Sequence, residues 1–381
     1  MSKIDELLDG VEVEWKPLGE VLVRTKGTKI TAGEMKELHK DNAPLKIFAG
    51  GKTVAFVNFE DIPKKDINRE PSIIVKSRGF IEFEYYDKPF SHKNEMWSYH
   101  SKNKNINIKF IYYFLKINEP YFQNIGGKMQ MPQIATPDTD KFKLPIPHLY
   151  IQTEIVRILD TFTELTAELT AELTAELTAR KRQYEYYRDK LLSFEEGEVE
   201  WKTLGELAEN LDSMRKPVTS GSREFGNIPY YGASGIVDYV KDYIFEGDFL
   251  LISEDGANLV ARNTPIAFSV SGKIWVNNHA HVLKFNTYEE RRFVEFYLNH
   301  IVLTPYISGA AQPKLNQKNL NSIIVPNPLP LEKKRIVSIL DKFYTLTSSI
   351  TEGLPREIEL RQKQYEYYRN MLLSFPKEEV N

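Results

Sequence analysis

The sequence repeats itself, and this internal duplication limits the possible folds more than any other feature. Residues 183–194 (QYEYYRDKLLSF) and 364–375 (QYEYYRNMLLSF) are identical at 10 of 12 positions. Residues 12–20 (EVEWKPLGE) recur at 198–206 (EVEWKTLGE) with eight of nine identities. Matches of this density, in the same order, indicate two copies of one unit.

A third pair of matching segments, IVRILD from Ile155 and IVSILD from Ile336, opens the two helical parts. By contrast, the regions between the repeats, about 21–144 and 207–325, barely resemble each other. A shared scaffold with divergent inserts is typical of a protein that binds two different targets with one architecture. The alternative is an ordinary duplicated fold whose loops have drifted.

The duplication predicts an α+β fold: two α/β recognition domains separated by two long antiparallel spacer helices, in a pseudo-two-fold internal repeat. With 381 residues, of which 41% are apolar, the chain is long enough and apolar enough to pack a core in each domain. The expected segments are 1–150 (first recognition domain with its opening motif), 151–195 (central spacer helix), 196–331 (second recognition domain) and 332–381 (C-terminal spacer helix).

The central segment from Gln152 to Phe194 contains no glycine or proline and is expected to form one long helix. Apolar residues at spacings of three and four form a stripe suited to packing against a partner helix. The spacer residues expected to make such contacts are Ile155, Leu159, Phe162, Leu165, Leu169, Leu173 and Leu177 in the first helix and Ile336, Leu340 and Phe343 in the second.

The second helical segment is interrupted by Gly353-Leu354-Pro355, which should end one helix and begin another. The shared aspartate and the shared glutamine are equally far apart in both copies, since Asp160 to Gln183 and Asp341 to Gln364 are each 23 steps. Equal lengths favour two helices that lie side by side and antiparallel.

The central helix carries the tetrapeptide TAEL three times over from Thr166 to Leu177. One added TAEL lengthens a helix by about 6 Å and turns its end by about 40°. One base pair of B-DNA advances about 3.4 Å and turns about 34–36°. The added rotation matches one base-pair step, whereas the added length does not. On the matching rotation, the tract predicts that one TAEL more or less changes the gap between two DNA half-sites by one base pair; inert helical filler is the alternative.

Charge does not by itself identify a nucleic-acid binder, because 50 basic and 53 acidic residues give a net charge of -3. Residues 13–150 carry 22 basic and 16 acidic side chains, a net of +6, whereas residues 199–331 carry 12 and 14, a net of -2. The second region must rely on local basic patches.

The chain has no cysteine, which excludes disulfides and a thiolate zinc site. The charged residues 1–10 do not look like a signal peptide, and no apolar run is long enough to span a bilayer. These features predict a soluble cytoplasmic protein without a membrane partner.

Two polar loops, residues 126–133 and 309–317, precede the Pro-rich approaches to the helices and are candidates for contact with DNA. Glutamine and asparagine suit adenine, and lysine and arginine suit guanine or phosphate. Glycine-containing turns at 49–53 and 230–235 are further candidates; solvated surface loops are the bland alternative. The candidate DNA-binding residues are Lys52, Thr53, Arg78, Lys128, Gln130, Gln133, Ser234, Arg262, Gln312, Lys314 and Asn316.

The sequence lacks the common catalytic motifs. Gly51-Lys52-Thr53 resembles the end of a phosphate-binding loop, but position 46 is lysine where that loop needs glycine. No hydrolase, metalloprotease, dinucleotide-binding or amino-methyltransferase tripeptide motif was found. His279 and His281 fit hydrogen-bonding or core roles better than metal binding. The sequence therefore predicts a non-catalytic chain without a metal site.

Over its whole length the sequence resembles the specificity (S) subunits of type I restriction-modification systems. The resemblance rests on residues 12–20 and their copy, on 154–194 with its TAEL tract, and on 336–375. TAEL repeats look like those of the subfamily in which repeat number sets the spacing of a bipartite site. One departure is that the second spacer has Gly353-Leu354-Pro355 in place of TAEL.

The resemblance implies that each variable region is a target recognition domain for one half of an asymmetric, bipartite sequence in double-stranded DNA. Two methyltransferase (M) subunits would use S-adenosylmethionine to methylate adenine, and motor-nuclease (R) subunits would use ATP and Mg for cleavage, with no cofactor bound by this chain. The alternatives are a subunit with the same scaffold that no longer works in an active complex or serves methylation alone, a coiled-coil adaptor for other proteins, and an autonomous nuclease.

Overall fold

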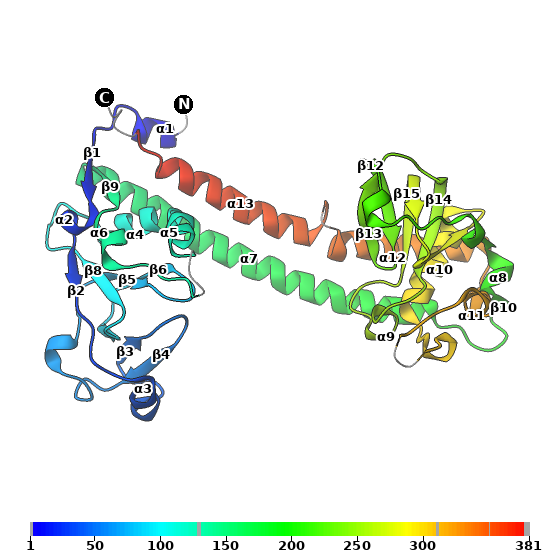
Figure 1. The fold of residues 1–381 in the computed structure, drawn as a ribbon, viewed down its shortest axis with the longest axis horizontal. Helices are drawn as coiled ribbons and strands as arrows, with labels where there is room; N and C mark the ends of the chain where they lie inside the picture. Colours follow the sequence, from blue (N-terminus) through cyan, green and yellow to red (C-terminus); the bar gives the residue numbers. More distant parts are fainter. Residues whose placement is uncertain (1–2, 128–130, 310–311, 350, 377–381) are drawn as a thin grey trace. The chain divides into compact units, whose positions relative to one another are not determined.

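The computed structural model describes residues 3–127, 131–309, 312–349 and 351–376. The chain divides into two compact units, which are Met1–Ala171 with Glu359–Asn381 (unit 1) and Glu172–Ile358 (unit 2). Both units combine sheets and helices, so the predicted α+β class is confirmed (Figure 1). Within the described residues, no helix is long and apolar enough to cross a membrane.

Unit 1 is built around an antiparallel sheet of four strands in the order β2-β8-β5-β6. The strands are β2 (Val23–Thr25), β5 (Ser72–Lys76), β6 (Glu82–Tyr86) and β8 (Trp97–His100). Helices α4 (Ile108–Ile117) and α5 (Glu119–Gly126) contribute to its core. The side chain of Asn107 caps α4 by accepting from the backbone of Lys109, and α4 buries Phe110 and Leu115 against the sheet.

A second, smaller sheet in unit 1 has three strands in the order β4-β3-β7. Its strands are β3 (Leu45–Phe48), β4 (Val54–Val57) and β7 (Phe90–His92). Helix α3 (Ala32–Leu38) packs against it and begins with a capping box between Thr31 and Glu34.

Unit 2 contains one sheet of six strands in the order β11-β16-β14-β15-β12-β13. Its strands are β11 (Glu209–Asn210), β12 (Phe225–Gly232), β13 (Gly235–Val240), β14 (Phe245–Ser253), β15 (Ala267–Val276) and β16 (Ala280–Lys284). Helix α10 (Tyr288–His300) packs on β14 and β15. The first four strands correspond in order, direction and connection to the four-stranded sheet of unit 1, so the two variable regions share a core that their sequences do not reveal.

The repeated opening motif forms a strand that pairs with the last strand of each recognition domain. In unit 1, β1 (Val13–Pro17) pairs antiparallel with β9 (Lys143–Pro147), the strand just before the long helix. In unit 2, β10 (Glu200–Thr203) pairs in the same way with β17 (Ile324–Asn327). The tryptophan of each motif, Trp15 or Trp201, lies opposite a proline of the partner strand.

The glycine of the opening motif permits a close helix contact. Gly19 lies in α2 (Leu18–Val21) beside α6 (Thr136–Asp140), and Gly205 lies in α8 (Leu204–Leu207) beside α11 (Gln317–Asn321). A Cβ atom at either glycine would lie 3.2 Å from a Cβ atom of the neighbouring helix, which leaves almost no room for a side chain.

The aspartate that ends the repeated helix-opening segment anchors each long helix to its own domain. Asp160 accepts from Lys109 Nζ at 2.8 Å and from Tyr113 OH at 2.6 Å. Asp341 accepts from Tyr288 OH at 2.7 Å and from Arg292 Nη2 at 2.6 Å. In unit 1 the lysine precedes the tyrosine along the helix, whereas in unit 2 the tyrosine precedes the arginine. In both units the two donors are four residues apart and therefore lie on one helix face.

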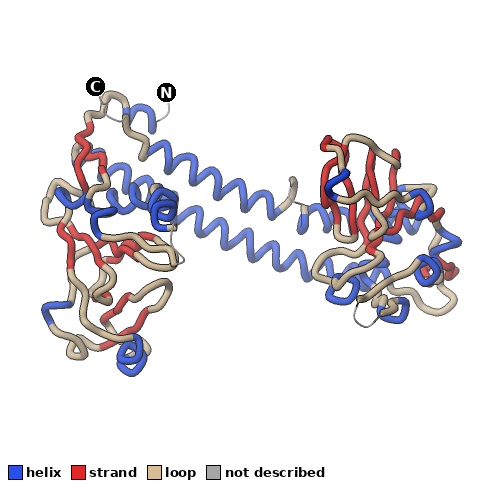
Figure 2. Tube along the Cα trace, viewed as in Figure 1, coloured by secondary structure: helices blue, strands red, loops and turns tan. Residues whose placement is uncertain are grey.

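Helix α7 (Leu149–Leu192) is continuous over 44 residues, as expected. The second segment consists of α12 (Pro330–Ser348) and α13 (Leu354–Leu372), so the predicted break is confirmed (Figure 2). Gly353, just before α13, has a positive φ of 84°. Within unit 1, α7 and α13 run antiparallel, because Phe162 contacts Tyr368 and the later Leu169 lines a groove with the earlier Arg361.

The predicted spacer residues have several different environments. Ile155 and Leu159 are completely buried in the core of unit 1, and Ile336 and Leu340 are buried in the core of unit 2. These four side chains pack within their own chain. Phe343 packs on Tyr184 and Tyr187 of α7, Leu165 and Leu169 are partly exposed, and Leu173 and Leu177 are half-buried.

Candidate nucleic-acid interface

In unit 1, the predicted loop meets the end of a central strand. Arg78, shortly after β5, forms an antiparallel bridge with Gln133, shortly before α6. The amide of Gly79 donates to the carbonyl of Pro132 at 2.9 Å, and the amide of Ile134 donates to Ser77 at 3.0 Å. The structure therefore brings together two residues, exposed Arg78 and half-buried Gln133, that were singled out separately in the sequence.

Unit 2 has the same arrangement at the end of β14. Asp255 bridges Lys314, and the amide of Gly256 donates to the carbonyl of Pro313 at 3.1 Å. The amide of Leu315 donates to the carbonyl of Glu254 at 2.7 Å. The loop positions 77–79 and 132–134 thus correspond to 254–256 and 313–315, but they carry different side chains.

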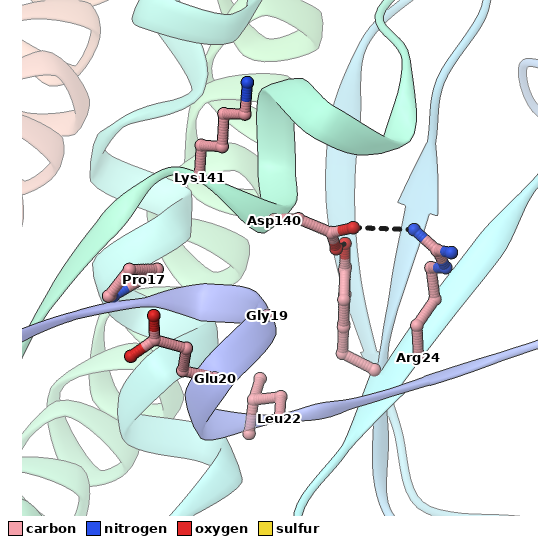
Figure 3. Close-up of a pocket in the computed structure, with 8 residues that line it drawn as sticks. Pro17, Gly19, Glu20, Leu22, Arg24, Asp140 and Lys141 are labelled. Atoms are coloured by element: carbon pink, nitrogen blue, oxygen red, sulfur yellow. Dashed lines mark hydrogen bonds and ion pairs between the residues drawn. The ribbon is translucent and has the colours of Figure 1, made fainter.

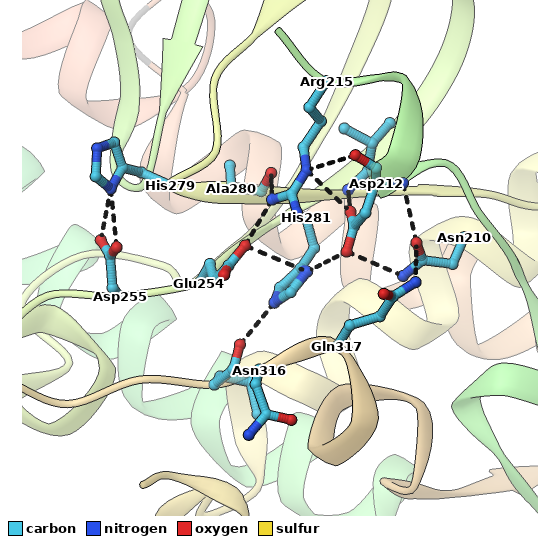
Figure 4. A network of polar contacts seen from close by, with 12 residues as sticks. Asn210, Asp212, Arg215, Glu254, Asp255, His279, Ala280, His281, Asn316 and Gln317 are labelled. Carbon is cyan, nitrogen blue, oxygen red and sulfur yellow. Dashed lines mark hydrogen bonds and ion pairs between the residues drawn. The ribbon is translucent and has the colours of Figure 1, made fainter. Parts of the chain in front are cut away.

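A buried polar network lies directly behind the loop of unit 2 (Figure 4). Nδ1 of His281 lies 2.6 Å from a carboxylate oxygen of Asp212, and Nε2 lies 2.7 Å from the carbonyl oxygen of Leu315. Asp212 also accepts from the amide of Val282 at 2.9 Å. The side chains of Asp212 and His281 are 3% and 1% exposed, so these contacts are shielded from water.

Ion pairs extend this network to the loop. Arg215 Nη1 donates to Glu254 at 2.6 Å, and Lys314 Nζ lies 3.2 Å from the same carboxylate. Burial favours the neutral form of Asp212 and Glu254, but His281, Arg215 and their hydrogen bonds outweigh it and lower the pKa of both carboxyls. Both therefore remain charged at neutral pH, where Glu254 pairs with the side chain of Lys314 and Asp212 holds His281 against the carbonyl of Leu315.

Other candidates lie at this end of the unit 2 sheet. The side chain of Asn316 caps α11 by accepting from the amide of Asn319 at 2.9 Å. Ser234 lies in the turn between β12 and β13, where the preceding carbonyl of Ala233 accepts from Ser253 at the end of β14. Gln312 is exposed.

The remaining candidate residues do not belong to either of the two bridged loops. Lys52 and Thr53 lie in the exposed turn between β3 and β4 of the smaller sheet. The guanidinium of Arg262 donates to the carbonyls of Leu298 at 3.2 Å and Ile301 at 2.7 Å, so it caps the end of α10. Lys128 and Gln130 lie outside the described residues.

Both histidines singled out in the sequence make hydrogen bonds, as predicted, and in each case the partner is a carboxylate. His281 is part of the buried network, and His279 Nδ1 lies 2.8 Å from Asp255. In the part of the chain that the structure describes, no group of three or more histidine and acidic residues could hold a metal ion. Sequence reasoning missed Asp212, Arg215 and Glu254; the one available signal was Glu254 following directly on an apolar strand.

A cavity of about 650 Å³ adjoins the opening motif of unit 1 (Figure 3). Within it, Arg24 Nη1 lies 2.7 Å from Asp140 Oδ2, and the hydroxyl of Tyr99 donates to Asp140 Oδ1 at 2.5 Å. Burial and this carboxylate raise the pKa of Tyr99 well above its usual range. These contacts tie β2 and β8 to α6, so the lining serves the packing of the domain.

Two copies of one sheet-and-helix domain, each with a polar loop at the same strand end, define a duplicated recognition protein. Residues 11–179 and 196–360 each match the family described as the type I restriction modification DNA specificity domain. The chain therefore belongs to the type I restriction-modification specificity subunits, and its function is DNA sequence recognition in such a system.

Individual relatives agree with this assignment. The chain is 38% identical over 416 residues to the EcoR124I/EcoR124II specificity subunit of Escherichia coli, covering 100% of this chain and 98% of that one. It is 33% identical to the EcoprrI specificity subunit of Escherichia coli, covering 92% of each. The S subunit structure from M. genitalium shares the fold with a TM-score of 0.55 at 19% identity, covering 99% of this chain and 100% of that one.

Proposed function

We propose that this chain reads an asymmetric, two-part DNA sequence, one half with each unit. The observation that carries the proposal is the equivalence of the two loops, which leave the same strand end but carry different side chains. Arg78 and Gln133 in unit 1 correspond to Asp255 and Lys314 in unit 2. Equivalent platforms with different hydrogen-bonding groups favour different bases in the two half-sites.

The test is to map modified adenines genome-wide in cells that carry this chain and its partner subunits. We expect one motif made of two unlike half-sites with a fixed gap. Exchanging Arg78 for alanine should relax the sequence of one half-site, and exchanging Lys314 for alanine should relax the other. A single uninterrupted motif, or two variants that relax the same half-site, would contradict the proposal.

Helix α7 is the proposed spacer. Its residues up to Ala171 belong to unit 1 and its residues from Glu172 onward belong to unit 2, and the helix is continuous across this boundary. The TAEL tract lies around the boundary and consists largely of strong helix formers. We therefore propose membership of the subfamily in which the number of repeats sets the gap between half-sites.

The proposed partners are two adenine methyltransferase subunits that use S-adenosylmethionine, and motor-nuclease subunits that use ATP and Mg. This chain itself supplies recognition and no catalysis. Two identical partner subunits need two equivalent binding surfaces. The motif QYEYYR, which occurs at 183–188 and again at 364–369, provides two equivalent surfaces. Tyr186 and Tyr367, its equivalent tyrosines, are 61% and 64% exposed, and each contacts the next tyrosine at a ring distance of 5.3 Å.

A further inference from the structure

Two large apolar side chains are exposed beside the Arg78–Gln133 bridge of unit 1. Phe80 is 62% exposed and Met131 is 63% exposed. Among the phenylalanines that the structure describes, only Phe80 and Phe225 are exposed. Exposed large apolar groups at neighbouring positions mark binding sites more often than ordinary surface does.

Backbone hydrogen bonds place these two residues next to each other. Gly79 and Pro132 are joined by a hydrogen bond of 2.9 Å, and Phe80 and Met131 are their direct neighbours, so both leave the bridge side by side. Ile81, the next residue, is buried, and its carbonyl accepts from Gln123 Nε2 at 3.0 Å. The backbone on both sides of the pair is thus hydrogen-bonded, so the two positions stay adjacent.

We infer that Phe80 and Met131 read a thymine in the half-site of unit 1, through contact with its 5-methyl group. This inference rests on the proposed function, in which this loop faces DNA. In the major groove the 5-methyl of thymine is the apolar group that distinguishes one base edge from another. The adjacent Arg78 and Gln133 carry groups suited to the major-groove edges of guanine and adenine, which places the apolar pair in the same groove.

The other way for an apolar side chain to act on DNA is as a wedge between base steps. Wedges are typical of minor-groove binders that kink the duplex, and the polar groups beside Phe80 favour the major groove instead. Unit 2 has no such apolar pair, because Ala257 and Gln312 occupy the positions that correspond to Phe80 and Met131. The two half-sites therefore differ in this methyl contact.

The test replaces each thymine of the mapped half-site by deoxyuridine, on either strand, which removes the 5-methyl group alone. Binding is measured with the complex assembled from this chain and its methyltransferase partners. One substitution should weaken binding about four-fold, since a buried methyl-sized group contributes about 0.8 kcal/mol. The Phe80→Ala variant should show a smaller difference between the thymine and uridine duplexes than the wild type, whereas Phe225→Ala, which removes an exposed phenylalanine of unit 2, should keep the full difference.

Several results would overturn the inference. They are a half-site without thymine, a wild-type complex indifferent to every uridine, and a uridine effect that is undiminished in Phe80→Ala. Weaker binding by Phe80→Ala without any uridine effect would point to a wedge instead. If Phe80→Ala does not fold, Phe80→Leu and Met131→Ala serve, each expected to reduce the uridine effect. Absence of any two-part site in the preceding mapping overturns the proposed function, and the inference with it.

Discussion

At the scale of single residues, Asp212 and His281 are 69 positions apart in the sequence but 2.6 Å apart in the fold. Their contact, together with Arg215 and Glu254, holds the loop that carries Lys314. The loop itself could be predicted, because glutamine, asparagine and lysine next to glycine are recognisable in a linear sequence. The network behind it could not, because Asp212 lies in a short 3-10 helix that Arg215 directly follows, Glu254 follows β14 and His281 lies in β16, and only the fold brings them together.

The buried carboxylate of Asp212 should make unit 2 sensitive to acid. Its folded-state pKa lies below that of an unfolded aspartate, about 3.9, so its contribution to stability is present above that pH and is lost as the pH falls through the folded pKa. Asp212→Asn removes the negative charge that faces His281 and Arg215, and should lower the free energy of unfolding at pH 7 by about 3 kcal/mol. As the pH falls, the free energy of unfolding of the variant should decrease less than that of the wild type.

Differential scanning calorimetry of the full chain between pH 3 and pH 8 measures both effects. Glu224→Gln is the matched control, because Glu224 pairs with Lys241 on the surface and both side chains are largely exposed. The control should follow the wild-type curve at every pH. An Asp212→Asn variant as stable as the wild type at pH 7 would show that the network does not hold the loop.

At the scale of helices and strands, the sequence correctly predicted the helices and the position where they are interrupted. The long helix α7 and the break before Leu354 both follow from where glycine and proline occur. The repeated glycine and aspartate proved to be packing and anchoring residues at Gly19, Gly205, Asp160 and Asp341. The common four-stranded core was not predictable, because a strand tolerates many residues as long as one face is apolar.

The equivalent tyrosines Tyr186 and Tyr367 provide a prediction at this scale. Replacing either by alanine should remove one partner anchor, because buried tyrosines at interfaces often contribute about 2 kcal/mol or more. Native mass spectrometry at limiting concentration should then show one methyltransferase subunit bound in place of two, and the double variant should bind neither. Tyr121→Ala, which removes an exposed tyrosine of α5 outside the repeats, is the control.

Full binding of two partners by both single variants would exclude this motif as the docking surface. Loss of both partners by one single variant would show that the two tyrosines do not act at separate sites. Circular dichroism of each variant separates these outcomes from unfolding, because the long helices dominate the signal.

At the scale of the whole molecule, the TAEL tract is the part whose length can be changed without touching either recognition domain. Adding one TAEL after Leu177 extends α7 by one turn and about 40° more. The mapped half-sites should keep their sequences while the gap grows by one base pair. A variant with four alanines in place of the added TAEL should give the same gap, since length and twist matter here and residue identity does not.

An unchanged gap, or a loss of both half-sites with the helix intact, would contradict this prediction. The sequence permits a prediction at this scale because a helix converts residue number into length and rotation by a fixed rule. It was not informative about which bases are read, because that depends on side chains meeting across loops.

The matched closures by β1 with β9 and by β10 with β17 have a combinatorial consequence. In each half, the paired strands enclose one segment of the chain, which we call a cassette: Val21 to Phe142 in one half and Leu207 to Ile323 in the other. Both cassettes begin and end next to an equivalent strand pair and an equivalent glycine contact. Recombination at the frames would exchange one cassette for another and leave the helices unaltered. A host that carries n such cassettes would then be able to produce as many as n × n distinct two-part specificities from a single frame.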